Sequence, residues 1–104
     1  MNTDAFRLDG KLAVVTGGAS GIGRAIALTF GSSGAAVHIL DLDEEAAGAT
    51  AEQIVEGGGT AAAHRCDVAD QGDVSRTFEE IAGQGGIDIL VNNAGIAHIG
   101  TVES

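Results

Sequence analysis

The segment from residue 16 to residue 23 restricts the fold of this 104-residue chain more than any other part of its sequence. It reads Thr-Gly-Gly-Ala-Ser-Gly-Ile-Gly and directly follows an apolar run at 11–16. Glycines at positions 17, 21 and 23 carry no Cβ, so the backbone can turn sharply and approach a ligand closely. A helical pattern starts at Gly21. The segment therefore predicts a buried strand, a tight turn and a helix whose first amides are exposed.

Strand-like and helix-like patterns alternate along the rest of the chain. Apolar runs predict four strands, at 11–16, 36–41, 60–65 and 87–91. Capping signals and periodic apolar residues predict three helices, from Gly21 to a stop at Gly34, from an Asp43 cap to Gly57, and from an Asp70 cap to Ala82. The predicted buried faces are Ile22, Ile26 and Phe30; then Ala47, Ala51, Ile54 and Val55; then Val74, Phe78, Ile81 and Ala82. This alternation predicts an α/β fold with a doubly wound parallel sheet, ordered β-α-β-α-β-α-β.

The charge balance excludes several classes of partner. Five Lys and Arg residues oppose 15 Asp and Glu residues, which gives a formal net charge of −10. Such a chain repels phosphate backbones and anionic lipids, so we expect neither nucleic-acid nor membrane binding. No apolar stretch approaches the roughly 18–20 residues that span a bilayer, and residues 1–10 lack the apolar core of a signal peptide. The single cysteine, Cys66, fits a reducing compartment and offers no metal cluster, so a cytoplasmic protein is expected.

Asp41 ends the predicted strand at 36–41. A carboxylate at this place in a dinucleotide-binding unit accepts hydrogen bonds from both ribose hydroxyls of adenosine and repels a 2′-phosphate. The sequence shows no Arg next to Asp41, so NAD is predicted over NADP. The alternative role is a helix cap, for which Asp43 is better placed.

The ends of the later strands add further polar groups. Asp67 and Val68 follow the third strand, and Asn92 and Asn93 follow the fourth. Because the carboxyl ends of parallel strands meet at one edge of a sheet, we expect these residues to face the glycine-rich loop. No Lys follows the glycines, which excludes an ATP-type phosphate loop.

In this order and spacing, the glycine segment, Asp41, the Asp67-Val68 pair and residues 88–95 (Asp-Ile-Leu-Val-Asn-Asn-Ala-Gly) resemble the short-chain dehydrogenase/reductase family. The resemblance implies a Rossmann-type sheet, here incomplete, with strand order 3-2-1-4. It implies NAD contacts at the pyrophosphate (Gly17, Ser20, Gly21, Ile22, Gly23), the ribose (Asp41), the adenine (Asp67, Val68) and the nicotinamide (Asn93, Ala94, Gly95). The resemblance also implies a structural role for Asn92 and Asn93, which would hold the central strands together through backbone hydrogen bonds.

The catalytic residues of the family have no counterpart in this chain. Relatives carry a Ser, a Tyr-x-x-x-Lys pair and an Asn beyond the equivalent of Ser104, whereas this sequence has no Tyr and one Lys, Lys11. We therefore expect residues 1–104 to be the truncated N-terminal part of a Rossmann domain, binding NAD but not catalytic alone. The alternatives are a non-catalytic dinucleotide-binding module and an inactive remnant. No substrate can be inferred.

Two further expectations concern packing. The strand at 87–91 would lie at the edge of the sheet, where its unpaired amides can pair with a second copy of the chain or with a complementing segment. His38 and His64 fall inside predicted strands and are expected to be structural, as is Cys66, which should be a buried and inert thiol.

Overall fold

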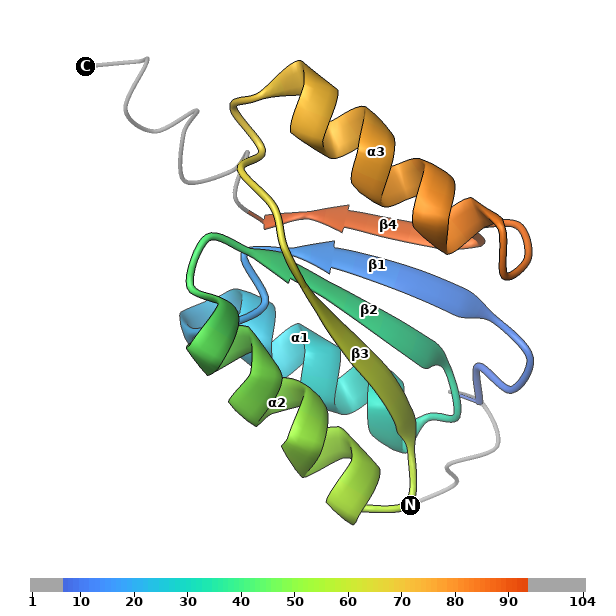
Figure 1. The fold of residues 1–104 in the computed structure, drawn as a ribbon. Helices are drawn as coiled ribbons and strands as arrows, with labels where there is room; N and C mark the ends of the chain where they lie inside the picture. Colours follow the sequence, from blue (N-terminus) through green and yellow to red (C-terminus); the bar gives the residue numbers. More distant parts are fainter. Residues whose placement is uncertain (1–6, 94–104) are drawn as a thin grey trace.

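Four parallel strands lie at the centre of the structure, a computed structural model that describes residues 7–93 (Figure 1). They are β1 (Leu12–Thr16), β2 (Ala36–Asp41), β3 (Thr60–Arg65) and β4 (Ile89–Asn92). Their order across the sheet is β3-β2-β1-β4, and all three neighbouring pairs are parallel. The predicted fold class and strand order are thus confirmed.

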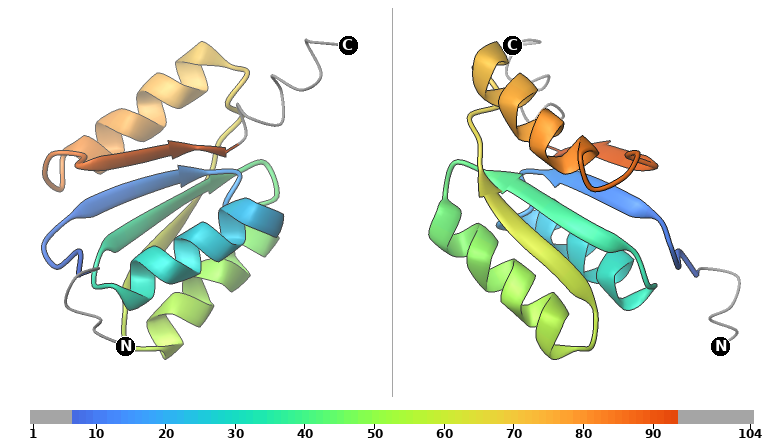
Figure 2. Two further views of the ribbon diagram at one scale, coloured as in Figure 1. Left: turned by 180° about the vertical axis from the view of Figure 1, so that it is seen from behind. Right: turned by 45° about the vertical axis from the view of Figure 1, so that its right-hand side comes forward.

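Helices cover both faces of this sheet. The helices α1 (Gly21–Ser32) and α2 (Glu44–Glu56) lie side by side on one face, and α3 (Gln71–Ala82) lies on the other (Figure 2). Asp43 and Asp70 cap α2 and α3 as predicted, because their carboxylates accept hydrogen bonds from the amides of Ala46 and Asp73. None of the helices within residues 7–93 is both long and apolar enough to cross a membrane.

The main core lies between the sheet and the two helices α1 and α2. Its buried centre includes Val15, Val37, Ile39 and Ile54. The buried residues of α1 are glycine and alanine, at positions 23, 27 and 31. A Cβ placed on Gly31 would lie 2.6 Å from Cγ2 of Ile54, so this glycine lets α1 and α2 approach closely.

The predicted helix faces are corrected at three positions. Ile22 is 73% exposed and Val55 is 52% exposed, and Ala82 is also exposed. On α3, Thr77 is buried beside Ile81 instead. On α1 the prediction failed only at Ile22, since Ile26 and Phe30 are partly buried against the core, although the fully buried residues of this helix are small.

The predicted strand at 87–91 is also corrected, since β4 begins at Ile89 and ends at Asn92. Asp88 precedes it and holds the start of β1. Its carboxylate Oδ2 accepts a hydrogen bond from the Leu12 amide at 2.9 Å, and its own amide donates to the Leu12 carbonyl. Lys11, predicted as the first residue of the first strand, lies just before β1.

The strand register brings several polar residues to one edge of the sheet. Thr16 of β1 is paired with Leu40 of β2 and with Asn92 of β4. Asp41 of β2 is paired with Arg65 of β3. All of these residues lie at or next to the carboxyl ends of their strands, from which the loops to α1, α2 and α3 leave the sheet.

Candidate functional site

The glycine-rich turn between β1 and α1 is held by its neighbours on both sides. Gly17 has φ +68°, which favours glycine, and its amide donates to the Leu40 carbonyl at 2.8 Å. A Cβ on Gly23 would lie 2.1 Å from the Gly17 carbonyl oxygen, so only glycine fits there. Asn93 donates from Nδ2 to the same oxygen at 3.2 Å. The turn is therefore bonded to β2 on one side and to the residue after β4 on the other.

The N-terminus of α1 differs from those of the other two helices. Its N-cap residue, Ser20, makes no capping hydrogen bond with its side chain, and the first turn carries no acidic residue. By contrast, α2 and α3 have aspartate caps and acidic residues in their first turns. Gly21 and Ile22 are exposed at this end. The positive end of the α1 dipole and its first amides thus face solvent, an arrangement suited to an anionic group.

Asp41 connects the glycine-rich turn to the loop that leads into α2. Its Oδ2 accepts from the Ala19 amide at 3.2 Å, and its Oδ1 accepts from the Asp43 amide at 3.0 Å. Asp43, not Asp41, caps α2, as expected. Each carboxylate oxygen can accept a further hydrogen bond, and the side chain is only half-buried, so Asp41 is able to receive two hydroxyl groups.

A cavity of about 130 Å³ lies beside Asp41. Its lining residues come from the ends of the first three strands and the loops after them: Gly17, Leu40, Asp41, Leu42, Cys66 and Val68. Leu42 and Val68 are 57% and 43% exposed, unusual for large apolar side chains. Apolar walls next to a carboxylate can hold a flat ring whose attached group is polar.

The structure separates the two predicted adenine contacts. Val68 lines the cavity, whereas Asp67 uses its carboxylate in the turn that leads to α3. Oδ1 of Asp67 accepts from the Ala69 amide, and the Asp67 amide donates to Asp73, each at 2.9 Å. The position of Asp67 is thus fixed by local hydrogen bonds within this turn.

Sequence reasoning missed several residues at this edge. A Cβ on Gly18 would lie 2.8 Å from Cγ2 of Ile39, so Gly18 is sterically restricted as well. The amide of Ala19 anchors Asp41, and Leu42 walls the cavity. The hydroxyl of Thr16 donates to Oδ1 of Asn92, which gives Asn92 the structural role the resemblance implied. Among these residues, Leu42 could have been found from the sequence, because it directly follows Asp41.

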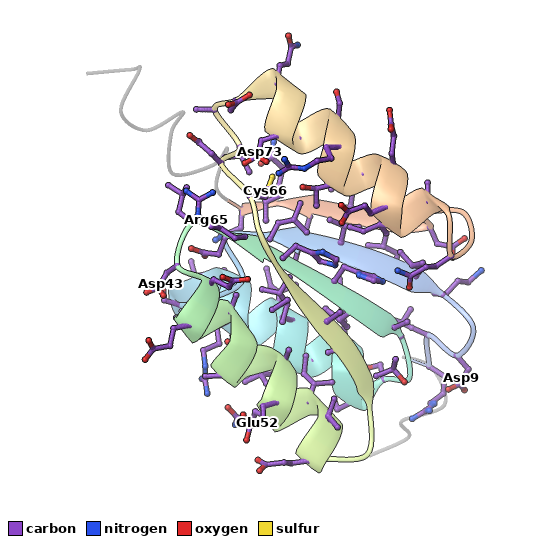
Figure 3. All side chains as sticks on the ribbon, viewed as in Figure 1. Asp9, Asp43, Glu52, Arg65, Cys66 and Asp73 are labelled. Carbon is purple, nitrogen blue, oxygen red and sulfur yellow. The ribbon has the colours of Figure 1, made fainter. Side chains whose placement is uncertain are left out.

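No Arg adjoins Asp41 in the sequence, but the pairing of β2 with β3 brings one beside it. Arg65 is the register partner of Asp41 on the neighbouring strand, and its side chain is exposed. Figure 3 shows Arg65 with Asp43 and Cys66 at the carboxyl end of the sheet, whereas Asp9 lies at the opposite end. The linear sequence hid this neighbour because strand register is not encoded in adjacent residues.

The remaining predicted residues, Ala94 and Gly95, lie outside the described residues, so the nicotinamide end is not described. A larger cavity, of about 370 Å³, lies at the amino ends of the strands, far from every predicted site residue, and includes Gly10, Lys11 and Gly85 in its lining. The polar side chains of its lining are those of Lys11, Thr60, Gln84 and Asp88, of which Asp88 is already bonded to the start of β1. We therefore place the candidate site at the carboxyl edge despite the smaller cavity there.

The two strand histidines form a pair on the face covered by α3. Nδ1 of His38 lies 2.8 Å from Nε2 of His64, and the rings stack with centroids 5.1 Å apart. Burial lowers the pKa of both imidazoles, and for His38 the neighbouring His64 lowers it further. The carboxylate of Glu80 on α3 opposes the shift at His64. Neither histidine lines the cavity beside Asp41. Cys66 is 1% exposed and free.

Comparison with known proteins agrees with this arrangement. Residues 11–104 match the family described as short chain dehydrogenase. A D-threitol dehydrogenase from Mycolicibacterium smegmatis is 49% identical over 102 residues, which cover 94% of this chain and 38% of that protein.

Two solved structures share the fold. One, a 7α-hydroxysteroid dehydrogenase complexed with NADH and 7-oxo glycochenodeoxycholic acid, has a TM-score of 0.83 at 41% identity, covering 88% of this chain and 36% of that one. The other, a metagenomic short-chain oxidoreductase in complex with NADP, has a TM-score of 0.81 at 40% identity, covering 83% and 39%. The chain thus spans less than two fifths of the length of these relatives.

Proposed function

The chain belongs to the short-chain dehydrogenase/reductase family, and on that premise we propose that it is the NAD(H)-binding portion of an oxidoreductase. In this proposal residues 1–104 are the N-terminal part of a Rossmann dinucleotide-binding domain. The observation that carries the proposal is the junction between β1 and α1. There a glycine turn, fitted closely against Asn93, leads into a helix whose N-terminus has no side-chain cap.

The pyrophosphate of the cofactor is assigned to this junction. The residues proposed to hold it are Gly17, Ser20, Gly21, Ile22 and Gly23. The exposed amides at the start of α1 would donate to the phosphate oxygens, and the exposed Ser20 hydroxyl would add one more donor. Acidic residues there would repel the phosphates, and α1 has none in its first turn.

Asp41 is assigned to the adenosine ribose. Its two oxygens are oriented by the amides of Ala19 and Asp43, so the carboxylate is already positioned before a ligand arrives. Val68 and the cavity walls would hold the adenine, with Asp67 supporting the turn behind it. Asn93, Ala94 and Gly95 are proposed for the nicotinamide side. Since a 2′-phosphate would meet the charge of Asp41, we expect NAD to bind more tightly than NADP.

In the whole protein the proposed reaction is hydride transfer between NAD and an alcohol or carbonyl substrate. The nicotinamide ring supplies or accepts the hydride when the cofactor is bound. This sequence holds no Tyr to serve as the acid, and its single Lys11 precedes β1 at the amino end of the sheet.

Two further expectations complete the proposal. The outer side of β4, the edge of the described sheet next to the exposed Leu90, would pair with a complementing segment or with a second copy. The free, buried thiol of Cys66 suits a reducing compartment, so we expect a cytoplasmic location.

Titration of the 104-residue chain with NADH and NADPH, followed by nicotinamide fluorescence, tests the proposal. We expect saturable binding of both, with NADH preferred. Asp41→Ala should weaken NADH binding about tenfold or more, because NADH loses its contact with the carboxylate. It should weaken NADPH binding less, because NADPH is also relieved of the repulsion between that carboxylate and its 2′-phosphate. Absence of saturable NADH binding would refute the proposed function, and equal losses for the two cofactors would refute the ribose assignment.

A further inference from the structure

Arg65 stands out among the cationic side chains of the chain. The other four are engaged or distant: Arg7 pairs with Asp9, Arg24 donates to Gln53, Arg76 pairs with Asp73, and Lys11 precedes β1 at the amino end of the sheet. The guanidinium of Arg65 forms no ion pair and no hydrogen bond with the residues that the structure describes. It is therefore a charged group at the proposed site whose function the fold does not account for.

The register places Arg65 beside the ribose carboxylate. Arg65 and Asp41 are Cα partners in the parallel pairing of β3 with β2, and the Cys66 amide donates to the Asp41 carbonyl at 3.1 Å. Neighbouring strands lie about 4.8 Å apart, and register partners point to the same face of a sheet. Val37 and Ile39 on β2 and Ala63 on β3 contact the α1–α2 core. By alternation, Asp41 and Arg65 project from that same face.

The end of β2 and the segment that follows it are acidic. Asp41, Asp43, Glu44 and Glu45 lie at the end of β2 and in the first turn of α2. A phosphate bound near this group of carboxylates would be repelled unless a cation offset the repulsion. Guanidinium is suited to that task, since its planar donors match two phosphate oxygens at once.

We propose that Arg65 is a specificity-determining residue that lets the adenosine end of the site accept a 2′-phosphate in spite of Asp41. This inference rests on the proposed function, because Asp41 must hold the ribose for the 2′ position to come within reach of β3. Under it, Asp41 favours NAD and Arg65 reduces that preference. The site therefore admits both dinucleotides, with the balance set by two register partners on adjacent strands.

The test uses two probes that differ only at the 2′ position, 5′-AMP and adenosine 2′,5′-bisphosphate. Both are titrated calorimetrically into the wild-type chain, Arg65→Gln and the charge-matched control Lys11→Gln. Arg65→Gln should weaken the bisphosphate about tenfold and 5′-AMP less than about twofold, the pattern expected when one charge-assisted contact is lost. Lys11→Gln, with the same change in net charge at the opposite end of the sheet, should change both by less than about twofold.

The outcomes separate this inference from the function it rests on. If Arg65→Gln weakens both probes equally or neither, the specificity role of Arg65 is wrong while adenosine binding stands. If the wild-type chain binds neither probe, both the specificity role and the proposed function are wrong. Circular dichroism of each variant checks that the exposed substitution leaves the fold intact.

Discussion

The two faces of the sheet are built differently. On the α1–α2 face, Val15, Val37 and Ile39 are fully buried beneath two helices. On the α3 face the buried cluster is smaller, and Leu90 of β4 remains 54% exposed. A groove of about 260 Å³ lies there, lined by Thr16, Val68, Val74, Phe78, Leu90 and Asn92. The first face is closed by the described chain, and the second stays partly open beside β4.

The closed face is the one that holds the glycine-rich turn in place. The turn and α1 belong to the closed face, where glycine and alanine at 23, 27 and 31 bring the helix close to its neighbours. Close packing fixes the start of α1 relative to the ends of β1 and β2. The proposed phosphate and ribose contacts therefore lie on the more fully buried side of the sheet.

The largest expected contrast is in stability. Ile39→Ala removes a side chain that is 0% exposed on the closed face and should lower the free energy of unfolding by about 2–5 kcal/mol. Leu90→Ala on the open face should cost less than about 1 kcal/mol, since most of the lost contact is with solvent. Urea unfolding measures both, and Ile39→Val, at about 0.5–1.5 kcal/mol, serves if the alanine variant does not fold. Equal losses for Ile39→Ala and Leu90→Ala would show that the two faces are equally closed.

The next contrast concerns two glycines. Gly23→Ala places a Cβ against the Gly17 carbonyl and Nδ2 of Asn93, so we expect a loss of about 1–3 kcal/mol and NADH binding at least tenfold weaker. Gly48→Ala is the matched control, because a Cβ there meets nothing within 4 Å. Because alanine has a higher helix propensity than glycine, this substitution should stabilise α2 by about 0.5–1 kcal/mol. Unchanged NADH affinity in Gly23→Ala would contradict the role assigned to the close approach.

The smallest effect is a pH dependence on the α3 face. The pKa values of His38 and His64 lie below the ordinary 6.5, so the unfolded chain takes up protons at a higher pH than the folded chain. The stability that the neutral pair provides is present above pH 6.5 and is lost as the pH falls through the lowered pKa values. Urea midpoints between pH 8 and 5 should therefore fall more steeply for the wild type than for His38→Gln/His64→Gln. Identical pH slopes for the wild type and the double variant would contradict the contribution of the histidine pair to stability.

The sequence predicted the features that depend on local pattern. Alternating apolar runs predicted the parallel sheet, and the caps Asp43 and Asp70 were correctly placed; the strand order was implied by the family resemblance. It did not predict what depends on register or on small residues. Ile22 was expected inside because large apolar side chains dominate a helical pattern, whereas Gly23 is what packs there. The positions of Arg65 beside Asp41 and of His38 beside His64 follow from the pairing of β2 with β3, which sequence neighbours do not reveal.

The central claim is that a dinucleotide binds at the carboxyl end of the sheet, and amide NMR during NADH titration tests it most directly. The predicted result is saturable shifts in the amides of Gly17, Ala19, Asp41, Cys66 and Val68. Gly10, Gly34 and Gly85, which line the larger cavity at the opposite end, should not move. Shifts confined to that amino-end cavity, or none at all, would contradict the claim.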